Sequence, residues 1–220
     1  MIFPTGGLHK FDASIDFESA CLAEPASVAY YGVSRINVTP SDRVIIFGAG
    51  TIGLLTLQAA KTFGAKQVVL VDRNEFRLQK AIELGADSVI DLTIESLSES
   101  CDLLTDGGGF DVVIEASGSP AAMENMLLAT KAGSRICLMG LCGGHPVKMD
   151  TDRIVITEIH LCGSLGSPGV WATVLDLMKS GKIITKPLIT HRFALNELDQ
   201  AFKTLLTKEP MLIKAVLKLE

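Results

Sequence analysis

Residues Val44 to Gly53 read VIIFGAGTIG, and this stretch decides the fold. Its first four residues are apolar and mostly β-branched, which predicts a buried strand; three glycines spaced G-x-G-x-x-G follow. We expect Gly48 to permit a tight turn, Gly50 to let a pyrophosphate approach the backbone, and Gly53 to let the next helix pack closely on the strand. That helix runs through Leu54–Lys61, so the phosphates would sit on free amides at its N-terminus.

An acidic residue, Asp72, stands at the end of the second predicted strand, and in a dinucleotide site such a carboxylate accepts hydrogen bonds from the adenosine ribose hydroxyls. A 2′-phosphate would meet this carboxylate at close range, where one charge pair is worth ~4 kcal/mol at an intermediate dielectric, about three decades of discrimination. Arg73 could instead recruit that phosphate, and Asp72 could simply flank the next helix. NAD is the predicted cofactor.

Short β-branched runs alternate with helical patterns between Arg43 and Ile184. This alternation predicts an α/β fold with a doubly wound parallel sheet, and the nearly continuous apolar runs indicate that helices cover both faces. The expected strands are Val44–Phe47, Gln67–Val71, Ser88–Ile90, Asp111–Glu115, Arg135–Met139 and Ile159–Cys162.

The helix after the second strand has readable ends. Asn74 is expected to cap it, and Gly85 stands where a left-handed residue would end it. Leu78, Ala81 and Ile82 are expected to form its apolar face.

The two ends of the chain do not show this alternation of strands and helices. Residues 1–24 have weak periodicity and lead into Pro25. The remaining expected elements are a helix Ala26–Ile36, a strand Leu188–Phe193, a helix Glu197–Leu206 and an apolar run Leu212–Leu219.

Composition excludes several classes of protein. The chain has 220 residues, 48% hydrophobic and 20% charged, with a formal charge of −5, which is typical of a globular protein. No lysine and arginine cluster provides the basic face that nucleic acid requires, and no apolar stretch is long enough to span a membrane. Because no signal segment starts the chain, we expect a cytoplasmic protein that binds neither nucleic acid nor membrane.

Cysteine and histidine residues indicate no self-contained metal site. The five cysteines are odd in number and scattered, which favours reduced, buried or incidental thiols over a disulfide framework. Cys137 and Cys142 lack the C-x-x-C spacing of structural zinc sites, and the four histidines form no H-E-x-x-H pattern.

Several motifs together resemble the zinc-containing medium-chain dehydrogenases, in particular their sorbitol and polyol dehydrogenase branch. The resemblance covers nearly the whole chain, and the most specific motif is the octet KPLITHRF. The motifs are Ala23-Glu24-Pro25, Gly48 to Gly53, Val71-Asp72 with Arg77, Glu115 to Gly118, Met139-Gly140-Leu141 and Lys186 to Phe193.

The resemblance implies a Rossmann-type coenzyme domain over residues 25–185, with remnants of a truncated GroES-like catalytic domain in residues 1–24 and 186–220. It also implies hydride transfer between the carbon of a secondary alcohol or polyol and NAD, with zinc polarising the alcohol oxygen. This is the C-terminal, coenzyme-binding portion of such an enzyme.

The resemblance also assigns site residues by position. Thr51 and Ile52 would complete the dinucleotide loop, and Arg73 and Arg77 would lie with Asp72 around the adenosine ribose. Otherwise Arg77 is a solvated helix residue. Residues expected to border the nicotinamide half are Ser117, Gly118, Met139, Gly140 and Leu141, although Met139 and Leu141 could be plain core. His191 lies in a segment that is structural in the family and is left out.

Two departures from the family are expected to matter. The cysteine, histidine and acidic zinc ligands precede the matched region in the family, so Glu24 is the one candidate metal ligand here, and it could instead be an acid favoured by the helix dipole. We therefore expect zinc as a family cofactor that this chain alone does not hold. Gly166 and Ser167 replace an arginine and a tyrosine that help hold polyols, which puts sorbitol in doubt.

Alternative functions remain open at this point. The first is a catalytically inactive NAD-binding fragment or module. The second is an S-adenosylmethionine methyltransferase, whose glycine loop usually has tighter spacing. The third is a zinc-free quinone reductase, whose loop usually starts with a small residue where Gly48 stands. We also expect a homodimer or homotetramer, because the family pairs the strand corresponding to Ile159–Cys162 across a two-fold axis.

Overall fold

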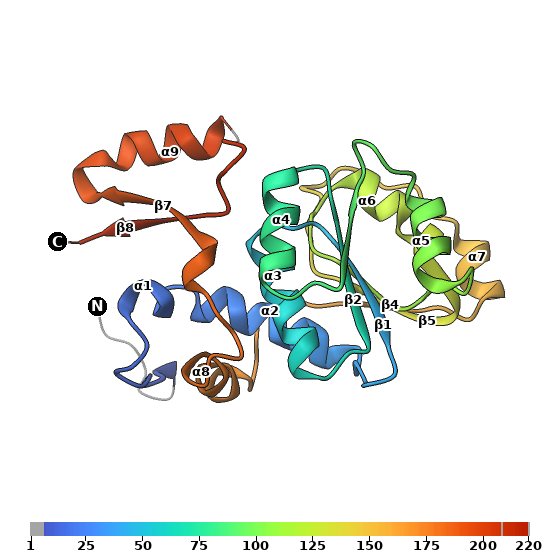
Figure 1. Cartoon of the computed structure of the whole chain (residues 1–220), viewed down its shortest axis with the longest axis horizontal. Helices are drawn as coiled ribbons and strands as arrows, with labels where there is room; N and C mark the ends of the chain where they lie inside the picture. Colours follow the sequence, from blue (N-terminus) through green and yellow to red (C-terminus); the bar gives the residue numbers. More distant parts are fainter. Residues whose placement is uncertain (1–6, 208, 220) are drawn as a thin grey trace.

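The computed structural model describes residues 7–207 and 209–219. Residues 1–6 of the predicted N-terminal segment, and residues 208 and 220 of the predicted C-terminal segment, lie outside the described residues. A sheet flanked by helices forms one lobe, and the two ends of the chain meet in a smaller lobe (Figure 1).

The large lobe is built on six parallel strands in the order β3-β2-β1-β4-β5-β6. This order reverses direction beside β1, as expected for a doubly wound dinucleotide-binding sheet, and the predicted fold class is confirmed. The strands are β1 (Arg43–Phe47), β2 (Gln67–Asp72), β3 (Ser88–Asp91), β4 (Phe110–Glu115), β5 (Thr130–Leu138) and β6 (His160–Gly163).

Helices cover both faces of the sheet. On one face lie α2 (Ala23–Arg35), α3 (Thr51–Thr62) and α4 (Glu75–Glu83), with α8 (Trp171–Lys179) packed on α2. On the other face lie α5 (Leu97–Thr105), α6 (Pro120–Asn125), η2 (Met126–Ala129) and α7 (Thr151–Ile156).

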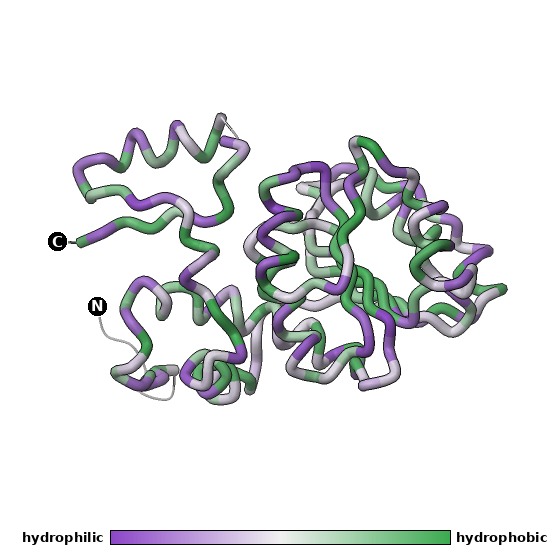
Figure 2. Tube along the Cα trace, in the orientation of Figure 1, coloured by the Kyte–Doolittle hydropathy of each residue, from purple (hydrophilic) through white to green (hydrophobic). Residues whose placement is uncertain are grey.

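The core alternates along β1 as a strand period requires. Val44 and Ile46 belong to the apolar cluster under α2 and α3, whereas Ile45 and Phe47 belong to the cluster under α5 and η2. Figure 2 shows the strands as the most continuously hydrophobic segments of the molecule. Both faces of the central strand are therefore buried, which explains its unbroken apolar sequence.

Two predicted element boundaries and one predicted buried residue need correction. Helix α2 begins at Ala23 rather than Ala26, because Pro25 falls in the first turn, where its missing N–H costs no hydrogen bond. Ile82 is 43% exposed, so the apolar face of α4 consists of Leu78 and Ala81. Strand β5 begins at Thr130 instead of Arg135, because a register shift opposite Phe110 accommodates extra residues.

The ends predicted for α4 are confirmed. The Asn74 side chain accepts a hydrogen bond from the Arg77 amide at 3.0 Å, and Gly85 has a φ of 95°, in the left-handed region.

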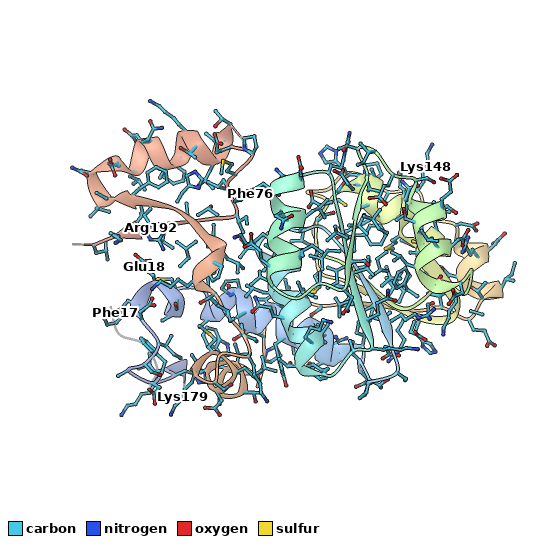
Figure 3. All side chains as sticks on the ribbon, in the orientation of Figure 1. Phe17, Glu18, Phe76, Lys148, Lys179 and Arg192 are labelled. Carbon is cyan, nitrogen blue, oxygen red and sulfur yellow. The ribbon has the colours of Figure 1, made fainter. Side chains whose placement is uncertain are left out.

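The smaller lobe combines α1 (Phe17–Ala20), β7 (Ile189–Ala194), α9 (Leu198–Leu206) and β8 (Lys214–Lys218), with the short turns η3 (Lys186–Leu188) and η4 (Leu195–Glu197). Strands β7 and β8 pair in parallel. The Glu18 carboxylate of α1 pairs with Arg192 at 2.8 Å and with Lys218 at 3.2 Å (Figure 3). Arg192 is the main reason that the pKa of Glu18 lies below its usual range. These ion pairs therefore link α1, near the start of the chain, to β7 and β8, near its end.

All five cysteines are free thiols. Burial raises the pKa of Cys101 to about 11 and that of Cys137 to about 12, so these two thiols stay protonated and unreactive. None of the described helices combines the length and the apolar composition needed to span a membrane.

Candidate functional site

A cavity of about 380 Å³ opens at the carboxyl edge of the sheet, beside the reversal of strand order. Ligands of doubly wound sheets bind in this position. The cavity is lined by Phe47, Gly48, Val71, Asp72, Arg73, Leu92, Leu97, Ser117, Ser119, Ala121, Ala122 and Asn125. The structure thus brings Gly48, Asp72, Arg73 and Ser117 together among the predicted site residues.

The three glycines of the loop have different surroundings. Gly48 has a φ of 98°, and a Cβ atom there would lie 2.8 Å from the Cβ of Ser117. A Cβ at Gly53 would lie 1.8 Å from the Gly48 carbonyl oxygen, so α3 can approach the loop this closely only with glycine. A Cβ at Gly50 would meet nothing within 4 Å. The structure therefore has the expected tight turn at Gly48, open space at Gly50 and close packing at Gly53.

Helix α3 begins directly at this loop, with Gly50 as its N-cap residue and no side-chain cap. The amides of Thr51, Ile52 and Gly53 form its first turn, where backbone donors lack intrahelical acceptors. These amides and the helix dipole suit a phosphate group above Gly50. The loop therefore fits the pyrophosphate of a dinucleotide.

Asp72 ties the end of β2 to the glycine loop. One carboxylate oxygen accepts a hydrogen bond from the Ala49 amide at 2.6 Å, and the other accepts from the amides of Arg73 at 2.7 Å and Asn74 at 3.0 Å. A carboxylate has about four acceptor positions. One position is left for a hydroxyl donor from the cavity.

Arg73 is exposed at the same corner, where Asp91 ends the neighbouring strand β3 opposite Asp72. Hydrogen bonds from Thr93 lower the pKa of Asp91, and the charge of Arg73 adds to this effect. Asp91 therefore stays ionised at neutral pH. Asp72 and Arg73 line the cavity, and Asp91 lies next to Asp72 in the sheet, outside the lining.

Two predicted site residues have side chains engaged elsewhere. The Thr51 hydroxyl donates to the Ile213 carbonyl at 2.8 Å, and the Arg77 guanidinium donates to the Leu212 carbonyl at 2.9 Å. Arg77 does not line the cavity, and its buried Nε has no partner within the described residues. These two side chains fasten the segment before β8 to the dinucleotide loop and to α4.

The predicted residues after β4 and β5 adjoin the cavity on its other side. A Cβ at Gly118 would lie 2.7 Å from the Leu141 carbonyl oxygen, and a Cβ at Gly140 would lie 2.2 Å from the Gly118 nitrogen. Leu141 is 81% exposed. The Met139 side chain instead packs toward α2, because a Cβ at Gly32 would lie 2.6 Å from its sulfur.

The sequence interpretation missed the apolar wall of the cavity, formed by Leu92, Leu97, Ala121 and Ala122, together with Asn125. Leu92 lies in the β3–α5 connection, Leu97 begins α5, and the other three residues belong to α6. Their sequences resemble ordinary core and helix positions. The one available signal is topological, since loops that follow neighbouring strands meet at one edge.

The described residues do not fit a zinc site. Across residues 7–207 and 209–219, no three histidine, cysteine, aspartate or glutamate side chains gather as metal ligands. Glu24 is exposed in the first turn of α2. A single carboxylate does not supply the three or four ligands that zinc takes, so no step through the metal is derived from this structure.

Comparisons with known proteins identify the family of the chain. The family model for zinc-binding dehydrogenases matches residues 51–180. The chain is 35% identical over 210 residues to L-idonate 5-dehydrogenase of Vitis vinifera, covering 93% of this chain and 57% of that protein. It is 34% identical over 212 residues to human sorbitol dehydrogenase, covering 96% and 58%. The chain thus spans less than two thirds of these relatives.

Solved structures give the same result. An Escherichia coli oxidoreductase/dehydrogenase of unknown specificity matches with a TM-score of 0.95 at 29% identity, over 98% of this chain and 62% of that one. A short chain alcohol dehydrogenase from E. coli CFT073, complexed with NADH, matches with a TM-score of 0.91 at 27% identity, over 99% and 64%. A Sinorhizobium meliloti zinc-binding dehydrogenase bound to NADP matches with a TM-score of 0.83 at 28% identity, over 88% and 57%. With more than half of its residues matched by the family model, the chain belongs to the zinc-binding dehydrogenase family.

Proposed function

We propose that this chain is the NAD-binding portion of a zinc-type alcohol or polyol dehydrogenase, which transfers hydride between a secondary alcohol and NAD. The observation that carries the proposal is the cavity beside the open Gly50 position, with Asp72 on its rim. The relatives named for sorbitol and L-idonate support a polyol substrate class.

In this proposal each group of residues has one task. The α3 amides bind the pyrophosphate, Asp72 accepts a ribose hydroxyl, and the apolar wall with Leu92 and Leu97 shields the adenine from water. Ser117, Gly118, Gly140 and Leu141 border the nicotinamide half. When bound, the nicotinamide ring supplies the hydride chemistry. Arg77 remains a proposed contact of the ribose, although one of its terminal nitrogens already donates to the Leu212 carbonyl.

The test is a calorimetric titration of the chain with NADH and with NADPH. We expect NADH to bind at least about tenfold more tightly, because Asp72 and Asp91 would repel a 2′-phosphate more than Arg73 attracts it. Asp72→Asn should reduce the preference for NADH over NADPH. The matched control is Asp87→Asn, which alters a carboxylate bonded to the Val68 amide at the opposite edge of the sheet. Equal or tighter NADPH binding would mean that Arg73 governs the pocket.

Self-association through β6 is a second expected property. Strand β6 is an edge of the sheet, and exposed apolar side chains gather on it and its flanks, namely Val155, Ile156, Leu161 and Leu165. Such an edge is stabilised by pairing with another chain. We expect sedimentation at micromolar concentration to give a dimer or tetramer.

A pair of variants tests the surface itself. Leu161→Lys should release monomers, since an edge lysine opposes strand pairing, whereas Ile94→Lys, at a position 83% exposed away from β6, should not. A clean monomer for the unaltered chain would contradict the proposal.

A polypeptide of these 220 residues is expected to bind NAD but not to oxidise alcohols. The physical reason is that Glu24 alone cannot hold the Lewis acid that the family chemistry uses. We expect little zinc by elemental analysis, and no NADH formation with sorbitol, threonine or simple secondary alcohols. Stoichiometric zinc, with zinc-dependent NADH formation that Glu24→Ala abolishes and Glu83→Ala does not, would contradict this expectation.

A further inference from the structure

Glu115, the last residue of β4, is a fully buried carboxylate. In the part of the chain that the structure describes, no lysine or arginine forms a salt bridge with it. A buried charge without a cation is costly unless hydrogen bonds satisfy it. A buried charge at the end of a core strand therefore calls for a specific role.

The carboxylate of Glu115 is satisfied by the turn that follows it in the chain. One oxygen accepts hydrogen bonds from the Ser117 amide at 2.9 Å and the Gly118 amide at 3.1 Å, and also from the Ser117 hydroxyl. The second oxygen lies 3.2 Å from the same Gly118 amide. These charge-assisted bonds hold Gly118 in its left-handed conformation, with a φ of 65°.

Glu115 also joins this turn to the loop after β5. The amides of Met139 and Gly140 donate to its main-chain carbonyl at 2.8 Å and 3.1 Å. A Cβ at Gly140 would lie 2.3 Å from its second carboxylate oxygen, so that oxygen rests against the Gly140 backbone. Glu115 therefore fixes the position of Gly118 relative to Leu141.

We propose that Glu115 is a positioning residue, whose buried carboxylate holds the Gly118 turn and the Gly140–Leu141 loop in the geometry that binds the nicotinamide half. This inference rests on the proposed function. Glu115 is absent from the lining of the cavity, and of the residues that it holds Ser117 belongs to that lining, whereas Gly118, Gly140 and Leu141 do not. Its effect should therefore differ between the two halves of the coenzyme.

Glu115→Gln tests this difference. The glutamine oxygen can still accept from Ser117 and, at 3.1 Å, from the Gly118 amide. Its NH₂ group, however, replaces the second oxygen, which lies 3.2 Å from the Gly118 amide, so that two donors meet there and the bonds lose their charge assistance. We expect NADH affinity to fall by about tenfold or more, and AMP affinity, which reports the adenosine half, to stay within about twofold.

Two further variants separate positioning from folding. Asp111→Asn alters a carboxylate at the opposite end of β4, where it accepts from the Arg43 amide, and should leave both ligands unaffected. Gly140→Ala is the positive control, because its Cβ would lie 2.2 Å from the Gly118 nitrogen and 2.3 Å from the Glu115 carboxylate, and it should reproduce the selective loss of NADH. The measurements are calorimetric titrations with NADH and AMP, together with thermal unfolding.

The outcomes are distinct. Equal losses for NADH and AMP, with a lowered melting temperature, would make Glu115 a structural residue and overturn the inference. Unchanged NADH affinity in Glu115→Gln would overturn it as well, whatever the effect of Gly140→Ala. Failure of the unaltered chain to bind NADH would overturn the proposed function and, with it, this inference.

Discussion

Gly53→Ala is expected to destabilise the chain strongly and to abolish NADH binding. The added methyl group would lie 1.8 Å from the Gly48 carbonyl oxygen and 2.9 Å from the Gly48 carbonyl carbon, and both are main-chain atoms. Helix α3 would have to move away from β1. Overpacking of this kind costs about 3 kcal/mol, which for a chain of this size lowers the melting temperature by about 6–12 °C.

Gly50→Ala provides the matched control in the same loop. Gly50 has a φ of −76° and open space around its Cβ position, so alanine should leave the melting temperature nearly unchanged. The methyl group would nevertheless occupy the space that the pyrophosphate needs, and NADH affinity should fall by at least about tenfold. Calorimetry and thermal unfolding of both variants separate packing from binding. A stable Gly53→Ala chain, or full NADH binding by Gly50→Ala, would contradict these roles.

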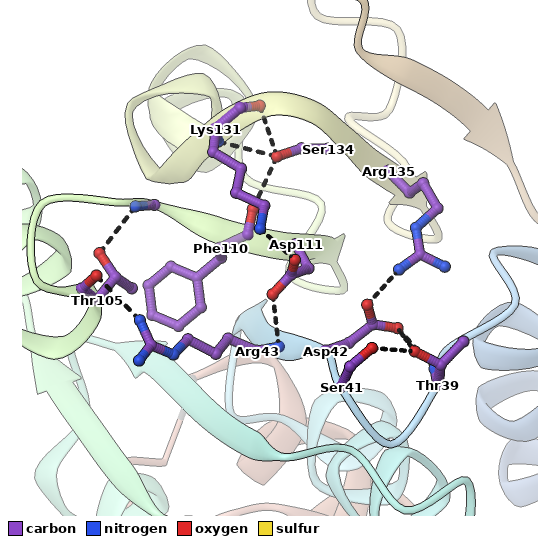
Figure 4. Close-up of polar contacts among 11 residues, drawn as sticks. Thr39, Ser41, Asp42, Arg43, Thr105, Phe110, Asp111, Lys131, Ser134 and Arg135 are labelled. Carbon is purple, nitrogen blue, oxygen red and sulfur yellow. Dashed lines mark hydrogen bonds and ion pairs between the residues drawn. The ribbon is translucent and has the colours of Figure 1, made fainter.

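Arg135→Met is expected to have the second large effect, at the edge of the sheet opposite the site (Figure 4). The Arg135 guanidinium donates to the carbonyls of Ile36 at 2.8 Å and Asn37 at 2.6 Å, and pairs with Asp42 at 2.5 Å. The Asp42 side chain is only 7% exposed and also accepts from the Thr39 amide. Arg135 therefore joins β5 to the end of α2 and the turn before β1.

Removing Arg135 leaves the Asp42 carboxylate buried without its cation, which costs about 3 kcal/mol and lowers the melting temperature by about 6–12 °C. NADH affinity should be unchanged, because none of these residues lines the cavity. Arg135→Met combined with Asp42→Asn should recover part of the loss, since the buried charge is then gone. An unchanged melting temperature in the single variant, measured by calorimetry, would contradict this account of the edge.

The parts of the fold that follow from local sequence were predictable. The unbroken apolar run of β1 and the three glycines specify a buried strand, a tight turn and a closely packed helix through short-range sterics alone. Asn74 and Gly85 mark the ends of α4 for equally local reasons.

Predictions failed where a residue depends on a distant neighbour. Ile82 fits the helical period of α4, but it is 43% exposed, because no element among the described residues covers that side of the helix. The early start of β5 depends on its pairing with Phe110, which no local pattern reveals. The parallel pairing of β7 with β8 was likewise beyond the sequence pattern.

The candidate site divides in the same way. Gly48 and Asp72 were predictable from motif spacing and strand ends, Ser117 was implied by the family resemblance, and all three line the cavity. The hydrogen bond from Thr51 to Ile213 was not predictable, because it joins residues 162 positions apart in the chain. The apolar wall escaped prediction because a leucine that faces a ligand and a leucine that faces the core have the same sequence signature.

A crystal structure of the chain with bound NADH is the most direct test of the proposed NAD site. We expect the adenine between Leu92 and Ala122, the pyrophosphate above Gly50 on the α3 amides, and the ribose hydroxyls within hydrogen-bond distance of Asp72. The nicotinamide should lie beside Gly118 and Leu141. Density for NADH elsewhere on the molecule, or a nucleotide whose phosphates avoid the α3 N-terminus, would contradict the account.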